Sequence, residues 1–310
     1  MNTATIKKDK CPVCGSASFT DLGIKTGKPT FEVSAIINGK EVSYRFQAYK
    51  CNICSLVYKS SQPDYDTLNA YYTGLDTGYE NTAVEFPTDR AVISLISDAD
   101  NKKLKILDYG CGSGRLLARL PETMEKFGVE INPEAVEAAR KRNINIVEEA
   151  VLDNQYQGAF DYIILTDVFE HLYQPLDLLG KLVNLLAPGG QLLIVTGNAD
   201  AISLPAYSGG YWYLQLFSHL QMLSKAHVQW LAEKLGLSVH AQLVTSHYDT
   251  PAGMKRKHAL AKFVFRSYHG TRKFLPFIWK LPKLNNVKNW PYPLFDTANN
   301  DHLVISLKKQ

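Results

Sequence analysis

A glycine-rich stretch, LKILDYGCGSGRLL, constrains the fold of this chain more than any other feature. A short apolar run ends in Asp108, and glycines then stand at three alternate positions, Gly110, Gly112 and Gly114. Glycine accepts positive φ and lets a ligand approach the backbone closely. The stretch therefore predicts a strand, a tight turn and a helix over 114–120, with a small molecule bound at the carboxyl end of the strand.

The second predicted strand supports a bound nucleoside. It reads FGV and ends in Glu130, which lies 16 residues after the last glycine. A carboxylate at this place can accept hydrogen bonds from both ribose hydroxyls of a nucleoside. Downstream, FDYIILTDVFEHL predicts a fourth strand with a polar loop after it, and LLAPGGQLLIVTGN predicts a helix end, a turn and a fifth strand.

Apolar runs alternate with helical patterns along this region, which predicts a parallel sheet covered by helices on both faces. Ser224 suits the N-cap of the last helix, and Gly236 suits its C-terminal stop. Helices are expected near 87–97, 114–120, 133–142, 175–186 and 224–235. Strands are expected near 104–108, 126–130, 144–148, 160–166, 191–197, 238–244 and 302–308.

In this order and at these distances, the motifs resemble those of the class I S-adenosylmethionine-dependent methyltransferases. The resemblance covers roughly Ala91 to Val244 and the last strand, DHLVISLKK. It implies a Rossmann-like, seven-stranded α/β sheet whose last strand is antiparallel, with S-adenosylmethionine as the cofactor. By the same resemblance, the cofactor is held at its methionine part by Asp108, Gly110, Gly112 and Gly114, at its ribose by Glu130 and at its adenine by Val151 and Leu152, while Asp167 faces it.

Four of the five cysteines form two pairs, Cys11 with Cys14 and Cys51 with Cys54. Each pair can present two thiolates from one turn, and two such pairs close a tetrahedral Zn²⁺ site with no open position, as in a structural zinc ribbon. The alternating sequence FEVSAIINGKEVSYRF between the pairs predicts a hairpin with Asn-Gly at its turn. A redox-active Cys-x-x-Cys is the alternative. Cys111, inside the glycine loop, is interpreted as a small residue that fits there.

The chain therefore divides into three parts. Residues 1–62 are expected to form the zinc ribbon, and 63–100 a tyrosine-rich linker with capping helices. Residues 101–310 are expected to form the methyltransferase core, with a basic insertion at about 246–300.

The acceptor is suggested by a second resemblance. A zinc module ahead of this core, with its CPVCGS and CNICSLVY motifs, resembles bacterial methyltransferases that act on sugars. It implies a sugar acceptor, nucleotide-linked or in a surface glycan, and a place in polysaccharide biosynthesis. A quinone or a small aromatic hydroxyl compound remains an alternative acceptor, and a zinc-ribbon binding module on a degenerate core is an alternative of another class. The net charge of +4 is modest for a protein that binds nucleic acid.

Two histidines are candidates for the general base that takes a proton from the acceptor, since imidazole titrates near neutrality. His171 follows the fourth predicted strand, and His219 follows the fifth. A metal is the alternative: Asp167, Glu170 and His171 together with His219 resemble the metal site of some 2′-O-methyltransferases of small RNA. The sequence leaves the choice open.

The sequence also bears on location. No apolar run reaches the length of a membrane-spanning helix, and MNTATIKKDK lacks the apolar segment of a signal peptide, so we expect a cytoplasmic protein with reduced cysteines. From Lys255 to Lys288 there are ten Lys and Arg residues and no Asp or Glu, with aromatic residues between them. Such a stretch can contact the anionic inner face of a membrane or cover a phosphate-bearing substrate, and both interpretations stay open.

Overall fold

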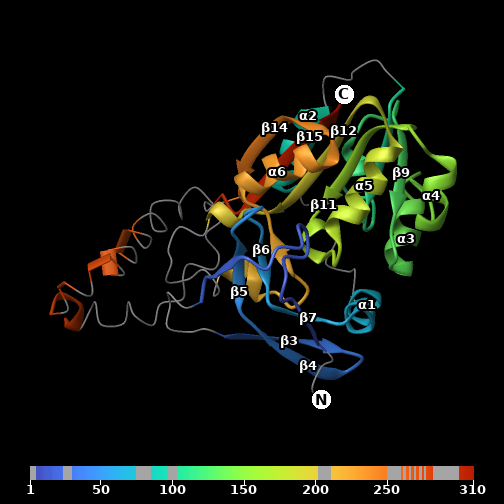
Figure 1. Ribbon diagram of the computed structural model, residues 1–310. Helices are drawn as coiled ribbons and strands as arrows, with labels where there is room; N and C mark the ends of the chain where they lie inside the picture. The colour runs from blue at the N-terminus through green and yellow to red at the C-terminus, as the bar shows by residue number, and fades with distance from the viewer. Residues whose placement is uncertain are drawn as a thin grey trace.

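The computed structural model describes residues 5–23, 30–74, 85–96, 103–201, 211–249 and 300–310, together with short stretches between 260 and 281. A central sheet with helices packed against it forms one part of the molecule, and the N-terminal strands, drawn in blue, lie at one end of that sheet (Figure 1). The predicted Rossmann-like α/β fold is confirmed.

The central sheet has the strand order β10-β9-β8-β11-β12-β15-β14. Its members pair in parallel except at β15, which is antiparallel to both of its neighbours. Because β15 runs the other way, its first residue stands at the same edge as the carboxyl ends of the parallel strands. The strands are β8 (Lys105–Tyr109), β9 (Glu125–Val129), β10 (Asn145–Ile146), β11 (Phe160–Thr166), β12 (Leu186–Gly197), β14 (Leu237–Thr245) and β15 (His302–Lys309).

Most predicted helices are present. Ser224 caps α6 by accepting a hydrogen bond from the His227 amide, and Gly236 ends that helix in the left-handed conformation. Helix α4, which precedes β11, was not predicted. The helices of the core are α2 (Pro87–Ile96), α3 (Pro133–Arg140), α4 (Glu149–Gln155), α5 (Pro175–Leu185) and α6 (Lys225–Leu235).

The helix predicted over 114–120 is wrong. The segment makes one 3₁₀ turn, Leu117–Arg119, and Leu120 is already extended. Pro121 disfavours the helical conformation in the residue before it, so a helix that starts after Gly114 has too few residues to propagate.

The N-terminal residues form short strands and one hairpin. Strands β3 and β4 pair across Asn38 and Gly39, whose φ values of 49° and 73° are those of a two-residue hairpin turn, as predicted. The strands of this part are β1 (Thr5–Lys7), β2 (Phe19–Asp21), β3 (Phe31–Ile37), β4 (Lys40–Phe46), β5 (Ala48–Cys51), β6 (Val57–Lys59) and β7 (Ser61–Pro63). Helix α1 (Tyr65–Thr73) follows them.

This N-terminal part shares a sheet with the core. The four-stranded order β13-β6-β5-β2 includes β13 (Gln221–Met222), which belongs to the chain after β12. The Ser224 hydroxyl donates to the Ser55 carbonyl at 3.0 Å, and the His227 Nδ1 lies 2.8 Å from the Cys54 carbonyl. The cysteine-bearing turns are therefore packed against the first turn of α6, in one hydrophobic cluster with the helices of the core.

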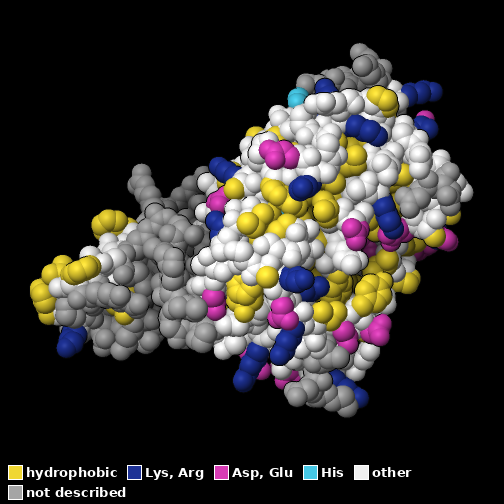
Figure 2. Space-filling model, in the orientation of Figure 1, with side chains coloured by type: hydrophobic (Ala, Val, Ile, Leu, Met, Phe, Trp, Pro, Cys, Tyr) yellow, Lys and Arg dark blue, Asp and Glu magenta, His cyan; other side chains and the backbone are white. Residues whose placement is uncertain are grey.

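Most of the predicted basic insertion and part of the tyrosine-rich linker lie outside the described residues, and so does most of the stretch considered for membrane contact. Among the described residues between 260 and 281, Phe274 is 81% exposed and Phe277 is 65% exposed. In the space-filling view, hydrophobic side chains gather at the left end of the molecule, where Figure 1 shows the described residues between 260 and 281 (Figure 2). Within the described part of the chain, no helix is long and apolar enough to span a bilayer.

Candidate functional site

The glycine loop joins β8 to the 3₁₀ turn and requires glycine at two positions. Gly110 has a φ of 82°, and a Cβ built there would lie 2.6 Å from Val168 Cγ2. Gly114 has a φ of 76°, and a Cβ built there would collide with Ile144 Cδ1. Both the backbone conformation and the lack of space exclude other residues, so the loop can approach its neighbours and a ligand closely.

Glu130, just past β9, holds this loop in place. Its Oε2 accepts a hydrogen bond from the Gly112 amide at 2.9 Å. Its Oε1 accepts from the amides of Ile131 at 2.7 Å and Asn132 at 2.8 Å. A carboxylate has about four acceptor positions, so Oε2 keeps one for a ligand hydroxyl. The predicted ribose contact of Glu130 is thus compatible with a second role, which is to shape the loop.

The loop is braced from two sides. Arg142 Nη1 donates to the Ser113 carbonyl at 2.6 Å and to the Ala138 carbonyl at 3.0 Å. Arg115 forms an ion pair with the buried Asp89 of α2. The Arg115 guanidinium also lies over the Phe86 ring, 4.7 Å from its centroid. These contacts fix the loop between α3 and the start of α2.

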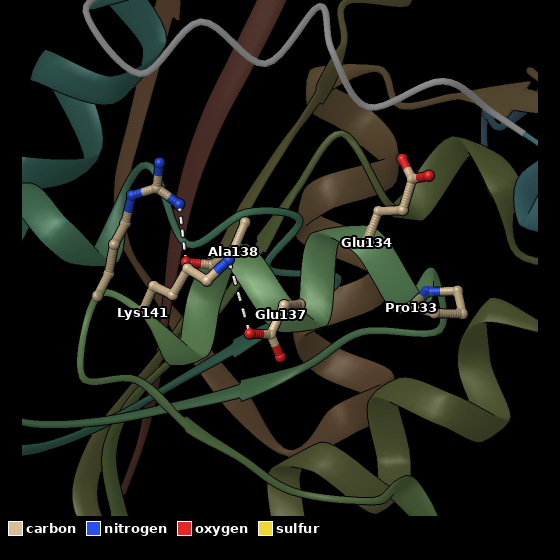
Figure 3. Close-up of a pocket in the computed structure, with 6 residues that line it drawn as sticks. Pro133, Glu134, Glu137, Ala138 and Lys141 are labelled. Atoms are coloured by element: carbon tan, nitrogen blue, oxygen red, sulfur yellow. Dashed lines mark hydrogen bonds and ion pairs between the residues drawn. The ribbon is translucent and has the colours of Figure 1, made fainter.

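A hollow of about 580 Å³ runs along α3, and Figure 3 shows the side chains of Glu137 and Lys141, an ion pair at 3.6 Å, along it. None of the predicted cofactor or base residues lines it. It is lined by Pro133, Glu134, Glu137, Ala138, Lys141 and Arg142.

Asp167 begins the polar cluster at the end of β11. It has a φ of 54°, an unusual value outside glycine that Asp tolerates better than most residues. Asp167 Oδ1 lies 3.4 Å from His302 Nε2, and Asp167 Oδ2 lies 3.9 Å from His247 Nδ1. Burial acts to raise the pKa of Asp167, but His302 and His247 outweigh it and hold that pKa well below its usual range.

Asp301 completes this cluster. Its Oδ1 lies 2.8 Å from His302 Nδ1 and also accepts the backbone amide of His247 at 2.9 Å. Burial acts to lower the pKa of His302, but the two carboxylates of Asp167 and Asp301 raise it to about 10. We name Asp167, His247, Asp301 and His302 the aspartate–histidine cluster. In the absence of a further ligand, His302 is an imidazolium ion between two carboxylates.

A second cluster surrounds Glu170. Tyr213 donates a short hydrogen bond to Glu170 Oε1, and the Thr196 hydroxyl donates to Oε2 at 2.8 Å. Glu170 is fully buried, and burial is the main reason that its pKa is raised. The His171 and His219 rings meet edge to face with centroids 4.8 Å apart. Burial lowers the pKa of His219 well below its usual value, so its imidazole is neutral near pH 7.

Asp167, Glu170, His171 and His219, considered from the sequence as an alternative metal site, do not form one group among the described residues. Among the described residues, Asp167 groups with His247 and His302, whereas the other three residues form a separate group. The left-handed conformation of Asp167 accompanies this separation, because its carboxylate lies with the ends of β14 and β15.

The four paired cysteines meet as predicted. The Sγ atoms of Cys11 and Cys54 lie 3.5 Å apart, and those of Cys14 and Cys51 lie 3.4 Å apart. All four lie within 4.8 Å of one another, and none is in a disulfide. A tetrahedral zinc ion with Zn–S bonds of about 2.3 Å separates its ligand sulfurs by about 3.8 Å. The thiol set therefore fits such an ion.

Comparison with known proteins identifies the family to which the central part of the chain is similar. A family model described as a methyltransferase domain matches residues 87–242, about half of the chain. The chain belongs to this methyltransferase family. It is an enzyme of the class I type that uses S-adenosylmethionine.

Similarity to curated relatives is confined to part of each protein. The tRNA U34 carboxymethyltransferase of Pasteurella multocida is 34% identical over 136 residues, which are 39% of this chain and 41% of that protein. The ribosomal protein L11 methyltransferase of Paraburkholderia phymatum is 32% identical over 138 residues, 43% of this chain and 44% of that protein. The chain thus spans less than half the length of the curated relatives it matches.

Among solved structures, a phosphoethanolamine N-methyltransferase 2 of Haemonchus contortus is 16% identical with a TM-score of 0.49, and the match covers 82% of this chain and 62% of that one. A coclaurine N-methyltransferase is 16% identical with a TM-score of 0.42, and the match covers 71% and 72%.

The predicted adenine contacts of this methyltransferase, Val151 and Leu152, belong to α4. Leu152 is buried in the main hydrophobic cluster, and Val151 beside it is half-buried. Next to Glu130, the apolar side chain of Ile131 is 56% exposed, a feature that was not predicted from the sequence.

His247 and His302 were also missed. No short motif contains them, because they are separated by more than fifty residues and meet only when β14 and β15 pair. The available signal was their place next to the ends of two predicted strands that meet at the cofactor edge.

Proposed function

We propose that this methyltransferase transfers a methyl group to a hydroxyl of a sugar, held between the N-terminal part and the carboxyl edge of the sheet. The observation that carries the proposal is the set of backbone hydrogen bonds at the joint between those two parts. Strand β13 pairs with β6, and the Leu220 amide donates to the Glu170 carbonyl at 2.7 Å. The zinc-binding part is thereby joined to the edge that carries His171 and His219, which agrees with a role in binding the acceptor.

The cofactor supplies an electrophilic methyl group, so the protein must mainly align and desolvate the acceptor. The glycine loop and Asp108 are proposed to hold its methionine part and Glu130 its ribose. Ile131 offers an exposed apolar surface for the purine, beside the predicted contacts Val151 and Leu152. Asp167 precedes Val168, whose side chain lies over Gly110, and it is proposed to face the cofactor from the end of β11.

His171 and His219 are proposed to remove the acceptor proton. Both side chains are partly exposed, and they face each other at the edge that joins the two parts. The neutral imidazole of His219 can accept a proton, and its Nδ1 has no hydrogen-bond partner among the described residues. His171 Nδ1 lies 3.0 Å from the Ser218 carbonyl, so its Nε2 is the atom that could face the acceptor.

The four cysteines are proposed to hold a structural zinc ion. Four thiolates complete a tetrahedral coordination sphere, and Cys51 and Cys54 are almost fully buried. The ion would then stabilise the turns on which α6 and β6 rest.

The acceptor is tested by radiolabelled methyl transfer from S-adenosylmethionine. We expect label in a nucleotide-linked sugar or a lipid-free glycan fragment, and none in a quinol or in bulk tRNA. His171→Ala and His219→Ala should lower the rate of transfer while leaving cofactor affinity unchanged. Because curated relatives include tRNA U34 carboxymethyltransferases, label found only in tRNA would overturn the sugar proposal in favour of an RNA acceptor.

A further inference from the structure

The aspartate–histidine cluster has the ligand set of a divalent metal site. We propose that Asp167, His247 and His302 bind a divalent transition-metal ion through one carboxylate and two imidazoles. Mn²⁺, Fe²⁺, Co²⁺ and Zn²⁺ accept such a mixed nitrogen and oxygen set. The site differs from the four-cysteine site in ligand chemistry and in place, since it lies where β11, β14 and β15 meet.

The distances suit an ion. The three ligand atoms lie within 4.8 Å of one another, and the two histidine nitrogens stand 3.4 and 3.9 Å from the two oxygens of Asp167. Metal–ligand bonds of about 2.1 Å place neighbouring ligands about 3.0–3.4 Å apart. The three side chains would therefore have to move closer together around a bound ion.

One of the histidine atoms also needs a partner. His247 Nδ1 is shielded from solvent and makes no hydrogen bond within the described residues. The Asp167 carboxylate stands 3.9 Å from it, farther than an ordinary N–H···O hydrogen bond of about 2.9 Å. A buried polar atom without a partner is costly, and a bound cation would satisfy it.

Asp301 supplies the outer support that metal-binding histidines usually have. A carboxylate can only accept, so His302 Nδ1 donates to Asp301, and a cation would take the place of the second ring proton on Nε2, which faces Asp167. The same Asp301 oxygen fixes the backbone of His247. On its other side, the His247 ring stacks on Phe86 with centroids 4.6 Å apart. Both imidazoles are therefore held before an ion arrives.

The neighbouring group of Glu170, His171 and His219 is less suited to a metal. Both oxygens of Glu170 already accept hydroxyl hydrogen bonds, from Tyr213 and Thr196. A cation there would have to displace them inside the core.

Three protein ligands leave coordination positions open. A hydroxyl or water bound there would lose its proton more readily, which is the usual contribution of a divalent ion to such a site. This task for the ion rests on the proposed function, whereas the binding of the ion does not. Because Asp167 directly follows the last residue of β11, the ion would lie at the carboxyl edge of the sheet, where the acceptor is proposed to bind.

The test is titration of the full chain with Mn²⁺. Binding is measured as the decrease of the free-ion signal in electron paramagnetic resonance. Mn²⁺ prefers nitrogen and oxygen ligands, so it leaves the thiolate site to zinc. We expect one Mn²⁺ per chain. His247→Ala should abolish measurable binding, and Asp301→Asn should weaken it about 10- to 100-fold. The matched control, His171→Ala, lies in the neighbouring group and should bind Mn²⁺ as the unmodified chain does.

Zinc content and S-adenosylmethionine affinity, measured on each variant, report whether the fold and the cofactor site are intact. If His247→Ala loses zinc, the more conservative His247→Gln replaces it. An unmodified chain that binds no Mn²⁺ at millimolar concentration, or a folded His247 variant that binds it normally, overturns the proposal and leaves an ion-paired cluster. Normal cofactor affinity alongside such a result would leave the proposed methyl transfer standing.

Discussion

The two polar regions at the carboxyl edge of the sheet are built in opposite ways. The proposed cofactor side consists of the glycine loop and the strand end at Glu130, and its hydrogen bonds join residues less than thirty positions apart. The other side joins Glu170 to Tyr213 and Asp167 to His302, across far greater separations. Local sequence specifies the first region, whereas only the completed tertiary structure creates the second.

This difference has an energetic consequence. On the cofactor side, a substitution mainly alters the shape of a loop that a ligand must meet. On the other side, polar contacts nearby also join the N-terminal part to the core: Lys59 donates a hydrogen bond to the Leu216 carbonyl at 2.8 Å. Substitutions there should change stability together with function.

The largest effect should follow from removal of the proposed zinc ion. In Cys51→Ser/Cys54→Ser we expect loss of zinc and a thermal unfolding transition that shifts for the whole molecule, because Cys51 and Cys54 share a hydrophobic cluster with α5 and α6. Elemental analysis and calorimetry measure the two quantities.

Cys111→Ser is the control, since Cys111 lies in the glycine loop and should not affect zinc content. Full zinc content in the double variant would rule out these ligands. Zinc loss with an unchanged core transition would show instead that the N-terminal part unfolds alone.

Gly114→Ala tests the glycine loop, the region that local sequence specifies. The new Cβ would collide with Ile144 and also carry the strain of a φ of 76°, so we expect a loss of about 3 kcal/mol in stability and weak cofactor binding. Gly158→Ala is the matched control, because Gly158 has a φ of 63° but open space around it. Denaturant unfolding of both variants separates the collision from the backbone strain. Equal losses in the two variants would contradict the proposed contact.

The same contrast explains what could be predicted from the sequence. The strands, the loop from Asp108 to Gly114 and the hairpin at Asn38 were predictable, because period, glycine spacing and turn residues act within a few positions. The four cysteines were predictable because each pair has a distinctive spacing. Long-range pairing left no such signal, which is why His247 and His302 were missed and why the grouping of Asp167 with them was not foreseen.

One local prediction also failed, for a physical reason that the sequence contained. The helix after Gly114 was predicted from its leucines, yet Pro121 follows too closely for a helix to form. The missed helix α4 has no N-cap side chain that bonds its first turn, so its start carried little sequence signal.

Glu130→Ala should have an intermediate effect. It removes three hydrogen bonds that shape the loop and the proposed ribose contact. Loss of bonds to a charged group corresponds to roughly 1.5–3 kcal/mol, or about 10- to 150-fold in the dissociation constant for S-adenosylmethionine. Calorimetric titration measures it, with Glu137→Ala on the exposed face of α3 as the control. An unchanged dissociation constant would remove Glu130 from the cofactor site.

The smallest effect should come from Lys59, whose titration should make the free energy of unfolding depend on pH. Its ammonium group is completely buried, and burial holds the pKa of Lys59 well below its ordinary value of 10.5. The unfolded chain keeps the proton up to about that value, whereas the folded chain releases it at lower pH. Unfolding therefore takes up a proton in this window, and the free energy of unfolding rises with pH by at most about 1.4 kcal/mol per unit.

Lys59→Met should remove this slope, because methionine has a similar length and no titrating group. Denaturant unfolding at several pH values between roughly 6 and 9 measures it, and Lys40→Met, at an exposed position in the hairpin, should keep the slope of the unmodified chain. Parallel curves for the Lys59 variant and the unmodified chain would mean that Lys59 is charged in the folded state. The joint would then depend on a buried cation between Tyr44, Phe46 and the Leu216 carbonyl, and Lys59→Met should destabilise the molecule at every pH.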